Sequence, residues 1–123
     1  MHIYESAEDY LEAVLMLQEN NGHVRSIDIA NELNFSKPSV SIAMKKLREN
    51  GYIEMDGNSL ITLTAEGRAI AERIYERHRI LTSLLLRLGV SEKNARTDAC
   101  RIEHDLSDES WEKIKTHALE HGV

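Results

Sequence analysis

At 123 residues the chain can form one compact domain or two small domains that share a core, and its formal net charge of −6 argues against general binding to nucleic acid. A single cysteine excludes an intramolecular disulfide, which fits a reducing compartment and predicts a cytoplasmic protein. No apolar run approaches the roughly 18 residues of a membrane-spanning helix, and the polar, acidic N-terminus is unlike a signal peptide, so no membrane association is expected.

Two helices are predicted at the start of the chain. Residues 6–20, SAEDYLEAVLMLQEN, combine a broad apolar stripe with acidic residues in the first turn, and Ser6 is the expected N-cap. Ser26 is the expected N-cap of a short second helix, IDIANEL, whose apolar residues recur at helical spacing.

A third helix and a β-hairpin are predicted next. Ser36 opens the helix, with Pro38 in its first turn, where a missing N–H does no harm. Residues 52–64 then carry two short β-type runs on either side of Asp-Gly-Asn-Ser, which is a hairpin signal. Helix, short helix, turn, helix and hairpin is the order of a winged helix-turn-helix, and three local signals in this order favour it over an unrelated small α+β fold.

The third predicted helix is the basic element of this acidic chain. Residues 36–48 contain lysines and an arginine but no acidic residue. Because salt screens distant charges more than near ones, such an element can bind phosphate, and hydroxyls at a helix N-terminus suit phosphates and base edges. Lys46 and Arg48 are equally consistent with solvated surface charges. The expected DNA-binding residues are Ser36, Lys37, Pro38, Ser39, Ser41, Lys45, Lys46 and Arg48.

Three more helices are predicted in the second half of the chain. Thr64 is the expected N-cap of a long helix that runs to Gly89. Ser91 is the expected N-cap of a helix through Leu106, and Ser107 of a last one. The long helix has more apolar surface than a winged domain could cover, which indicates either an internal core helix or a dimer interface. We expect a homodimer, because so small a protein has little else to cover this surface.

Cys100, Glu103 and His104 stand at i, i+3 and i+4 within the segment DACRIEHDL. On an α-helix these side chains leave one face, and a thiol, a carboxylate and an imidazole together can ligate a transition metal. The same spacing also arises by coincidence, because a lone cysteine is commonly a small buried hydrophobe and a lone histidine an ordinary surface or core residue. The triplet by itself leaves both interpretations open.

Four segments of the chain match a known family: AEDYLEAVLML, IANELNFSKPSVSIAMKKLRENGYI, ITLTAEGRAIAERIYERHRIL and DACRIEHDLSDE. With these segments the chain resembles the diphtheria toxin repressor and manganese transport regulator family of metal-dependent transcriptional repressors, over nearly its whole length. Because it stops at Val123, it resembles the short members that lack an SH3-like domain. The resemblance implies a mainly α fold, with a winged helix-turn-helix DNA-binding domain over residues 1–64 and a helical metal-binding and dimerisation domain over residues 65–123.

The resemblance also implies a metal site built from three helices. Two of the family's ligand positions lie three residues apart on the first helix, one lies in the long helix, and the remaining three form the triplet described above. The implied metal ligands are Asp9, Glu12, His78, Cys100, Glu103 and His104.

This ligand set is a hybrid of two types within the family. Manganese-type members resemble the chain at Asp9 and Glu12 but have a carboxylate where Cys100 stands. Iron-type members resemble it at Cys100 but have methionine where Asp9 stands and a basic residue where Glu12 stands. A thiolate favours Fe(II), Co(II) or Zn(II), whereas carboxylates also suit Mn(II). We expect Fe(II) first and Mn(II) next, with Zn(II), Co(II) or Ni(II) as ions that also bind in vitro.

The function implied is that of a metal-dependent transcriptional regulator, a repressor of metal-uptake genes whose binding to double-stranded DNA at a palindromic operator is activated by metal. The alternative is a metal-independent winged-helix regulator in which Cys100 is a redox sensor. An enzyme is not expected, because the sequence has no glycine-rich phosphate loop, nucleophile elbow or HExxH motif.

Overall fold

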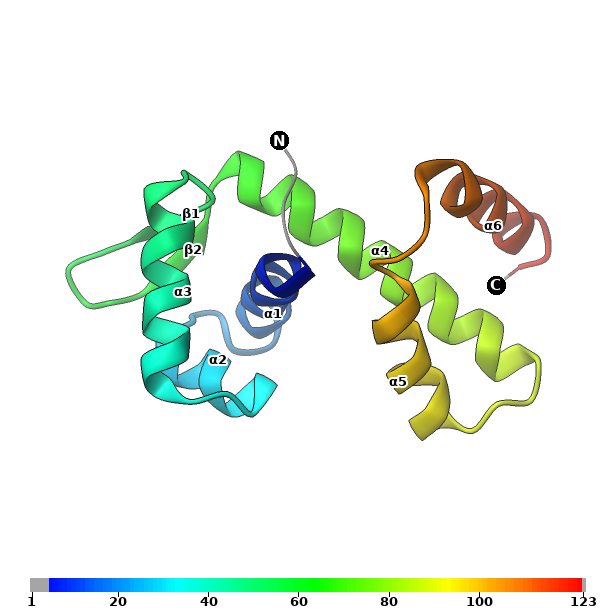
Figure 1. The fold of residues 1–123 in the computed structure, drawn as a ribbon, viewed down its shortest axis with the longest axis horizontal. Helices are drawn as coiled ribbons and strands as arrows, with labels where there is room; N and C mark the ends of the chain where they lie inside the picture. Colours follow the sequence, from blue (N-terminus) through cyan, green and yellow to red (C-terminus); the bar gives the residue numbers. More distant parts are fainter. Residues whose placement is uncertain (1–4, 123) are drawn as a thin grey trace. The chain divides into compact units, whose positions relative to one another are not determined.

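The computed structural model of the chain describes residues 5–122. It is mainly α-helical with one two-stranded sheet, which confirms the predicted fold class (Figure 1). In chain order the elements are α1 (Glu5–Asn21), α2 (Ser26–Leu33), α3 (Lys37–Glu49), β1 (Ile53–Met55), β2 (Ile61–Leu63), α4 (Ala65–Arg87), α5 (Glu92–Ile102) and α6 (Asp108–Glu120). Among the described residues, no helix is both long and apolar enough to cross a lipid bilayer.

The chain divides into two compact units, of which one ends at Glu72 and the other begins at Arg73. We call them the N-terminal unit and the C-terminal unit. The division falls inside α4, so the first turns of this helix belong to the N-terminal unit and the rest to the C-terminal unit.

The N-terminal unit has the predicted winged arrangement. α1 contacts α2, α3 and β2, and α3 contacts β1. The two strands pair antiparallel with Ile53 opposite Leu63, and they form the wing. Most of the apolar side chains that the helical patterns place inward are buried between these elements; they include Leu11, Val14, Leu15, Ala30, Val40, Met44 and Leu47. The expectation was wrong for Ile27 of α2, which is 38% exposed, whereas Ile29 is buried.

Four of the predicted N-caps are present. The side chains of Ser36, Ser91 and Ser107 each accept a hydrogen bond from the backbone N–H three residues later, and Thr64 Oγ1 accepts one from Gly67 at 3.1 Å. Each of these bonds satisfies one of the helix's unpaired N–H donors. The start of α3, α4, α5 and α6 therefore follows from local sequence.

Two other N-cap predictions were wrong. Ser26 lies inside the first turn of α2, and Arg25 is the N-cap, with extended backbone and its N–H donated to Asp28 Oδ2 at 2.9 Å. The Asp28 carboxylate thus caps this helix from within, so a Ser26 hydroxyl is not needed. Ser6 is also not an N-cap, because α1 already includes Glu5.

The C-terminal unit is built from the remainder of α4 with α5 and α6. Its buried cluster combines one residue from each helix, namely Leu81, Ala99 and Trp111. The prediction that the fifth helix reaches Leu106 was wrong, because α5 ends at Ile102 and a turn follows at residues 103–105. The chain turns here because Arg77 of α4 donates to the backbone carbonyls of Glu103 and Leu106, which a longer helix would have bonded instead.

Candidate metal centre and nucleic-acid interface

Glu103 is the centre of a group of candidate ligands in the C-terminal unit. It is fully buried in the turn after α5. His78 Nδ1, from α4, lies 2.9 Å from its Oε2 atom, and His104 Nε2 lies 3.4 Å from its Oε1 atom. The two imidazoles are largely covered as well, with 23% and 2% of their side-chain surfaces exposed. One carboxylate therefore brings together two imidazoles that come from different elements.

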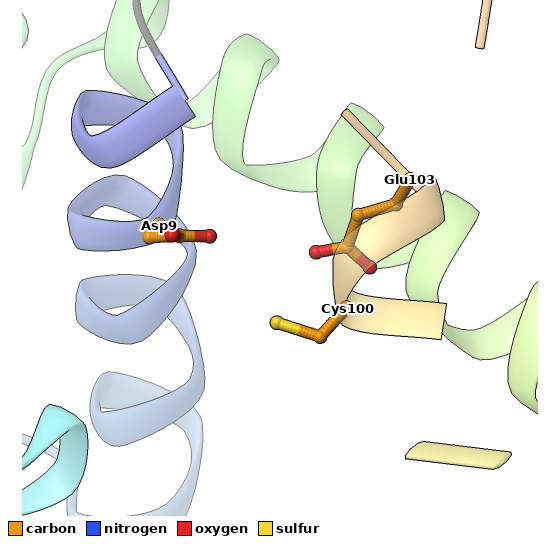
Figure 2. Close-up of side chains that lie close together, drawn as sticks. All are labelled: Asp9, Cys100 and Glu103. Atoms are coloured by element: carbon orange, nitrogen blue, oxygen red, sulfur yellow. The ribbon is translucent and has the colours of Figure 1, made fainter. Parts of the chain in front are cut away.

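Cys100 joins this group from the last turn of α5. Its Sγ atom lies within 4.8 Å of a carboxylate oxygen of Glu103, and the two side chains extend from the same side of their segment (Figure 2). Glu103 is past the end of α5, but its backbone keeps right-handed helical angles of φ −57° and ψ −27°. The i, i+3 relation predicted for these two residues is therefore preserved, although α5 ends between them.

The chemistry of these four groups fits a divalent transition metal. A thiolate, a carboxylate and two imidazoles are the ligands that Fe(II), Co(II) and Zn(II) accept readily. A carboxylate removed from water is costly unless it is compensated, and here the compensation includes two imidazole nitrogens. A cation bound at the same carboxylate would compensate it with a full charge.

The other two predicted ligands lie in the N-terminal unit, on α1. Asp9 and Glu12 are three residues apart on this helix, with Asp9 half-buried and Glu12 buried. Burial raises the pKa of the Tyr10 hydroxyl, and the charge of Asp9 raises it further. Glu8, which the sequence analysis did not single out, is buried to the same extent as Glu12 and stands four residues before it. α1 therefore presents a carboxylate-rich side next to its apolar one.

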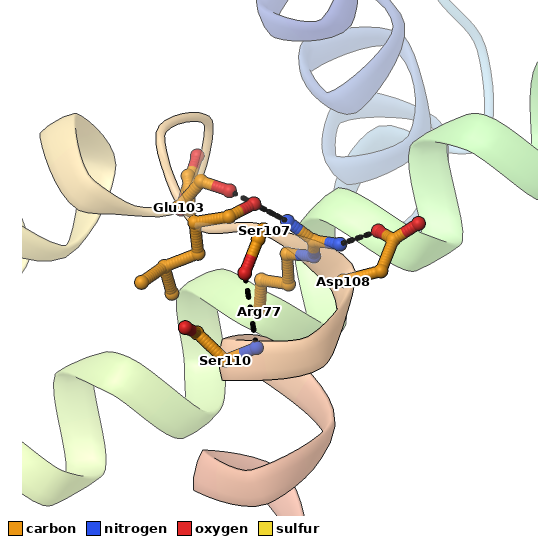
Figure 3. Close-up of polar contacts among 6 residues, drawn as sticks. Arg77, Glu103, Ser107, Asp108 and Ser110 are labelled. Carbon is orange, nitrogen blue, oxygen red and sulfur yellow. Dashed lines mark hydrogen bonds and ion pairs between the residues drawn. The ribbon is translucent and has the colours of Figure 1, made fainter.

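Arg77 is the residue of the C-terminal unit that sequence reasoning missed. Only 5% of it is exposed, and its guanidinium donates to the carbonyls of Glu103 at 3.2 Å and Leu106 at 3.4 Å (Figure 3). It also donates to Asp108 Oδ1 at 3.1 Å and lies over the ring of Trp111. These carbonyl contacts end α5 at the turn. A signal was present in the sequence, because Arg77 stands at core spacing in α4.

The predicted DNA-binding residues all lie on the exposed side of α3 or at its N-terminus. Ser36 Oγ accepts from the N–H of Ser39 at 3.3 Å and lies 2.8 Å from the Ser39 hydroxyl. The opposite side of α3 is buried through Val40 and Met44. The exposed residues are Ser36, Lys37, Pro38, Ser39, Ser41, Lys45, Lys46 and Arg48.

Two exposed residues of the N-terminal unit extend this surface beyond the prediction. Ile42 is 58% exposed on α3, one residue after Ser41 and three before Lys45. Arg25 donates from Nε to the carbonyl of Asn58 at 3.3 Å, which adds a cation to a wing tip that has none of its own. Neither residue could be assigned to this surface from local sequence, because the contact of Arg25 spans 33 residues and a single isoleucine has no distinguishing pattern.

Two family models match the chain. Residues 2–59 match the iron dependent repressor N-terminal DNA binding domain, and residues 64–121 match the iron dependent repressor metal binding and dimerisation domain. Together the two matches cover most of the sequence, and they divide it near the start of α4.

Sequence relatives agree with these matches. The transcriptional regulator MntR of Escherichia coli O6:H1 is 38% identical over 122 residues, which is 99% of this chain and 79% of the relative. An HTH-type transcriptional regulator of Methanocaldococcus jannaschii is 38% identical over 113 residues, 90% of each protein.

Solved structures with the same fold are longer than this chain. A manganese-dependent transcriptional repressor in complex with manganese has a TM-score of 0.82 at 29% identity, over 91% of this chain and 52% of the other. The IdeR protein of T. acidophilum has a TM-score of 0.81 at 27% identity, over 100% of this chain and 56% of the other. The chain thus spans about half the length of these structures.

Proposed function

Because the chain belongs to the iron dependent repressor family, we propose that it is a transcriptional repressor whose binding to a palindromic DNA operator is activated by a divalent metal ion. The observation that carries the proposal is the gathering of Cys100, His78 and His104 around the buried carboxylate of Glu103. The family consists of transcriptional regulators, which are not enzymes, and we assign no catalytic residue.

We propose that candidate ligands of both units hold the metal. In the C-terminal unit Glu103 is already close to each of its neighbours, which supports their joint role. In the N-terminal unit the i, i+3 spacing on α1 gives two carboxylates on one helical face. The proposed ligands are Asp9, Glu12, His78, Cys100, Glu103 and His104.

The negative charges of the proposed ligands explain how the protein would respond to metal. When bound, a divalent cation supplies positive charge that offsets the ionised carboxylates and thiolate. Without that charge, Asp9, Glu12 and Glu103 would repel one another if they shared a site. The N-terminal unit contains both α1 and the exposed surface of α3. If Asp9 and Glu12 of α1 bind the metal, the ion would therefore influence the orientation in which α3 meets DNA. The metal-loaded arrangement is then selected because it binds the ion better.

We propose that Fe(II) is preferred over Mn(II). The thiolate of Cys100 is a softer ligand than a carboxylate, and affinity for nitrogen and sulfur donors rises from Mn(II) to Fe(II). The names of several relatives point to manganese, and Asp9, Glu12 and Glu103 suit that ion too. The balance between the thiolate and the carboxylates therefore decides the selectivity.

On the DNA side we propose that α3 enters the major groove of a palindromic operator as part of a homodimer. Two copies of a helix-turn-helix unit read half-sites about one helical turn apart, roughly 34 Å, or a multiple of it. The hydroxyls at the N-terminus of α3 face base edges and phosphates, and Lys45, Lys46 and Arg48 contact phosphates. A repressor of this kind acts where the chromosome is, in the cytoplasm.

The experiment that tests this function measures DNA binding with and without a chelator. Duplexes recovered from a random-sequence pool by the metal-loaded protein serve as probes, and Fe(II) or Mn(II) is titrated anaerobically in a fluorescence anisotropy assay. We expect DNA binding that requires metal in the wild type and in Asp98→Asn, an exposed carboxylate on α5. We expect Glu103→Gln to bind DNA weakly at any metal concentration.

DNA binding that is the same with and without the chelator would contradict the proposal of a metal-dependent repressor. The exposed thiol of Cys100 would then favour the alternative regulator, and a peroxide titration of DNA binding would test it. Unchanged metal dependence in Glu103→Gln would instead show that the metal centre lies elsewhere in the protein.

A further inference from the structure

We propose that Arg77 is a positioning residue of the metal centre, which fixes the turn that carries Glu103 and His104 in the conformation needed for ligation. This inference rests on the proposed function, and it adds a residue that no ligand pattern contains. Arg77 does not bind the ion; it acts through the backbone of the residues that do.

Two consecutive residues of α4 contact Glu103, one through its side chain and the other through its backbone. His78 contacts the Glu103 carboxylate at 2.9 Å, whereas Arg77 donates to the Glu103 backbone carbonyl at 3.2 Å. Successive side chains on a helix point about 100° apart. Both contacts therefore form only if Glu103 packs against α4 between the directions of the Arg77 and His78 side chains. The side chain and the main chain of Glu103 are thereby fixed by separate partners.

The guanidinium of Arg77 also contacts residues beyond Glu103, because its nitrogens donate in several directions. One nitrogen, Nη1, donates to the carbonyl of Glu103, the first residue of the turn, and to that of Leu106, which directly follows it. The other, Nη2, donates to Asp108 in the first turn of α6. The planar group also lies 5.4 Å from the centre of the Trp111 ring. A single buried cation therefore links the end of α5, the turn and the start of α6 (Figure 3).

The ion pair with Asp108 is not the main part of this link. The Asp108 side chain is 94% exposed, whereas that of Arg77 is 6% exposed, so solvent screens their attraction. The contact with the Glu103 carbonyl is the best protected one, because the Glu103 residue is fully buried, and the contact with the Leu106 carbonyl is partly buried. Lysine has the same charge but no planar fork, so it cannot donate to both carbonyls and Asp108 in this geometry.

A fixed turn matters for metal binding because ligands that are already oriented lose less freedom when the ion binds. Groups that orient metal ligands typically change metal affinity by about 10- to 100-fold when they are removed. We therefore expect Arg77→Met to lower metal affinity by roughly tenfold or more. We expect a smaller loss for Arg77→Lys, which retains the charge and one donor group.

The matched control is Arg79→Met. Arg79 lies on the same helix and is exposed, and its guanidinium lies 5.2 Å from the centre of the ring of Tyr75, which is also on α4. Both substitutions remove one positive charge from α4 and replace arginine by the same side chain. A difference between them therefore reports the contacts of Arg77 and not the charge of the helix.

Two measurements on the full chain test the proposal. The first is hydrogen–deuterium exchange of the metal-free protein, read at the backbone N–H groups of Glu103 and Asp105, which bond to Ala99 and Ile102 in the structure. We expect faster exchange there in Arg77→Met than in the wild type or Arg79→Met. The second is an anaerobic Co(II) titration, read from the visible and thiolate charge-transfer absorption of the complex. We expect weaker binding and altered bands in Arg77→Met only.

The outcomes separate this proposal from the function on which it rests. Equal Co(II) affinity and equal exchange in Arg77→Met and the wild type would overturn the role of Arg77 while leaving metal-dependent DNA binding intact. If Arg77→Met does not fold, Arg77→Lys is measured in the same way, and wild-type affinity and exchange would overturn the role. Failure of the proposed function is recognised in the wild type alone, as DNA binding that does not respond to metal.

Discussion

The imidazole nitrogen Nδ1 of His78 lies 2.9 Å from the carboxylate oxygen Oε2 of Glu103, although the two residues are 25 positions apart. An ionised carboxylate only accepts hydrogen bonds, so when Glu103 is ionised the imidazole donates from Nδ1, and the lone pair of a neutral ring is then on Nε2. Two proposed ligands, one from α4 and one from the turn after α5, therefore lie close together. The same bond competes with ligation, because the proton must leave if both atoms are to bind metal.

Replacing Cys100 by aspartate changes the donor that distinguishes Fe(II) from Mn(II). We expect Cys100→Asp to raise Mn(II) affinity relative to Fe(II) by roughly tenfold, because a carboxylate replaces the softer thiolate. The ratio is measured by competition of each ion against a fluorescent chelator under anaerobic conditions. Cys100→Ser is the control, since it removes the thiolate without adding a charge. An Mn(II)-to-Fe(II) ratio that is the same in all three proteins would mean that Cys100 does not set selectivity.

The lysines of α3 make a separate prediction about salt. Each phosphate contact that is lost should reduce the slope of log affinity against log salt concentration by about one. We therefore expect this change for Lys45→Ala and for Lys46→Ala in the metal-loaded protein. Lys93→Ala, an exposed lysine on α5, should leave the slope unchanged. If the salt dependence of both α3 variants equals that of the wild type, the two lysines do not contact phosphate and are solvated surface charges.

The helix starts were predictable where the information is local. The N-cap bonds of Ser36 and Ser91 connect residues three apart, so the sequence within one turn contains both partners. The prediction failed at Ser26 because two caps were available within the same few residues. The Asp28 side chain accepts the backbone N–H of Arg25, and this places the helix start one residue earlier.

The candidate metal centre was predictable only in part, because some of its contacts are local in sequence and others are not. Cys100 and Glu103 are three residues apart, and their common face followed from helical geometry. His78 entered only through the resemblance to a family, because its contact with Glu103 depends on how α4 and the turn pack. Arg77 was missed because its acceptors lie 26 to 31 residues away, and an arginine at core spacing is usually interpreted as a surface residue.

Gly67, in the first turn of α4, is at a position where a larger residue should destabilise the protein. A Cβ atom at this position would overlap the carbonyl oxygen of Tyr52, whose backbone cannot move aside as a flexible side chain could. We expect Gly67→Ala to lower the free energy of unfolding by about 1–3 kcal/mol, measured by urea denaturation. Gly57→Ala, in the wing turn with open space around it, should change stability little. Equal midpoints for the two variants would contradict this account of the close approach.

An exposed leucine directly after α4 leads to a prediction of where the proposed homodimer forms. Leu88 is 79% exposed in a single chain, and Leu84, four residues earlier, is only half-covered. Burial of this surface against a second copy would remove apolar area from water, whereas an aspartate there would have to be desolvated. We expect Leu88→Asp to weaken dimerisation by about 2 kcal/mol or more, which is roughly thirtyfold in the dissociation constant.

Sedimentation velocity over a range of protein concentrations measures this effect. Ile42→Asp is the matched control, because it places the same charge at another exposed apolar position, on α3 in the N-terminal unit. We expect Ile42→Asp to dimerise as the wild type does, since α3 is the proposed DNA surface and not the dimer surface. A Leu88→Asp protein that remains dimeric at the same concentrations would place the interface on another face. A wild type that is monomeric would remove the two-fold arrangement on which a palindromic operator depends.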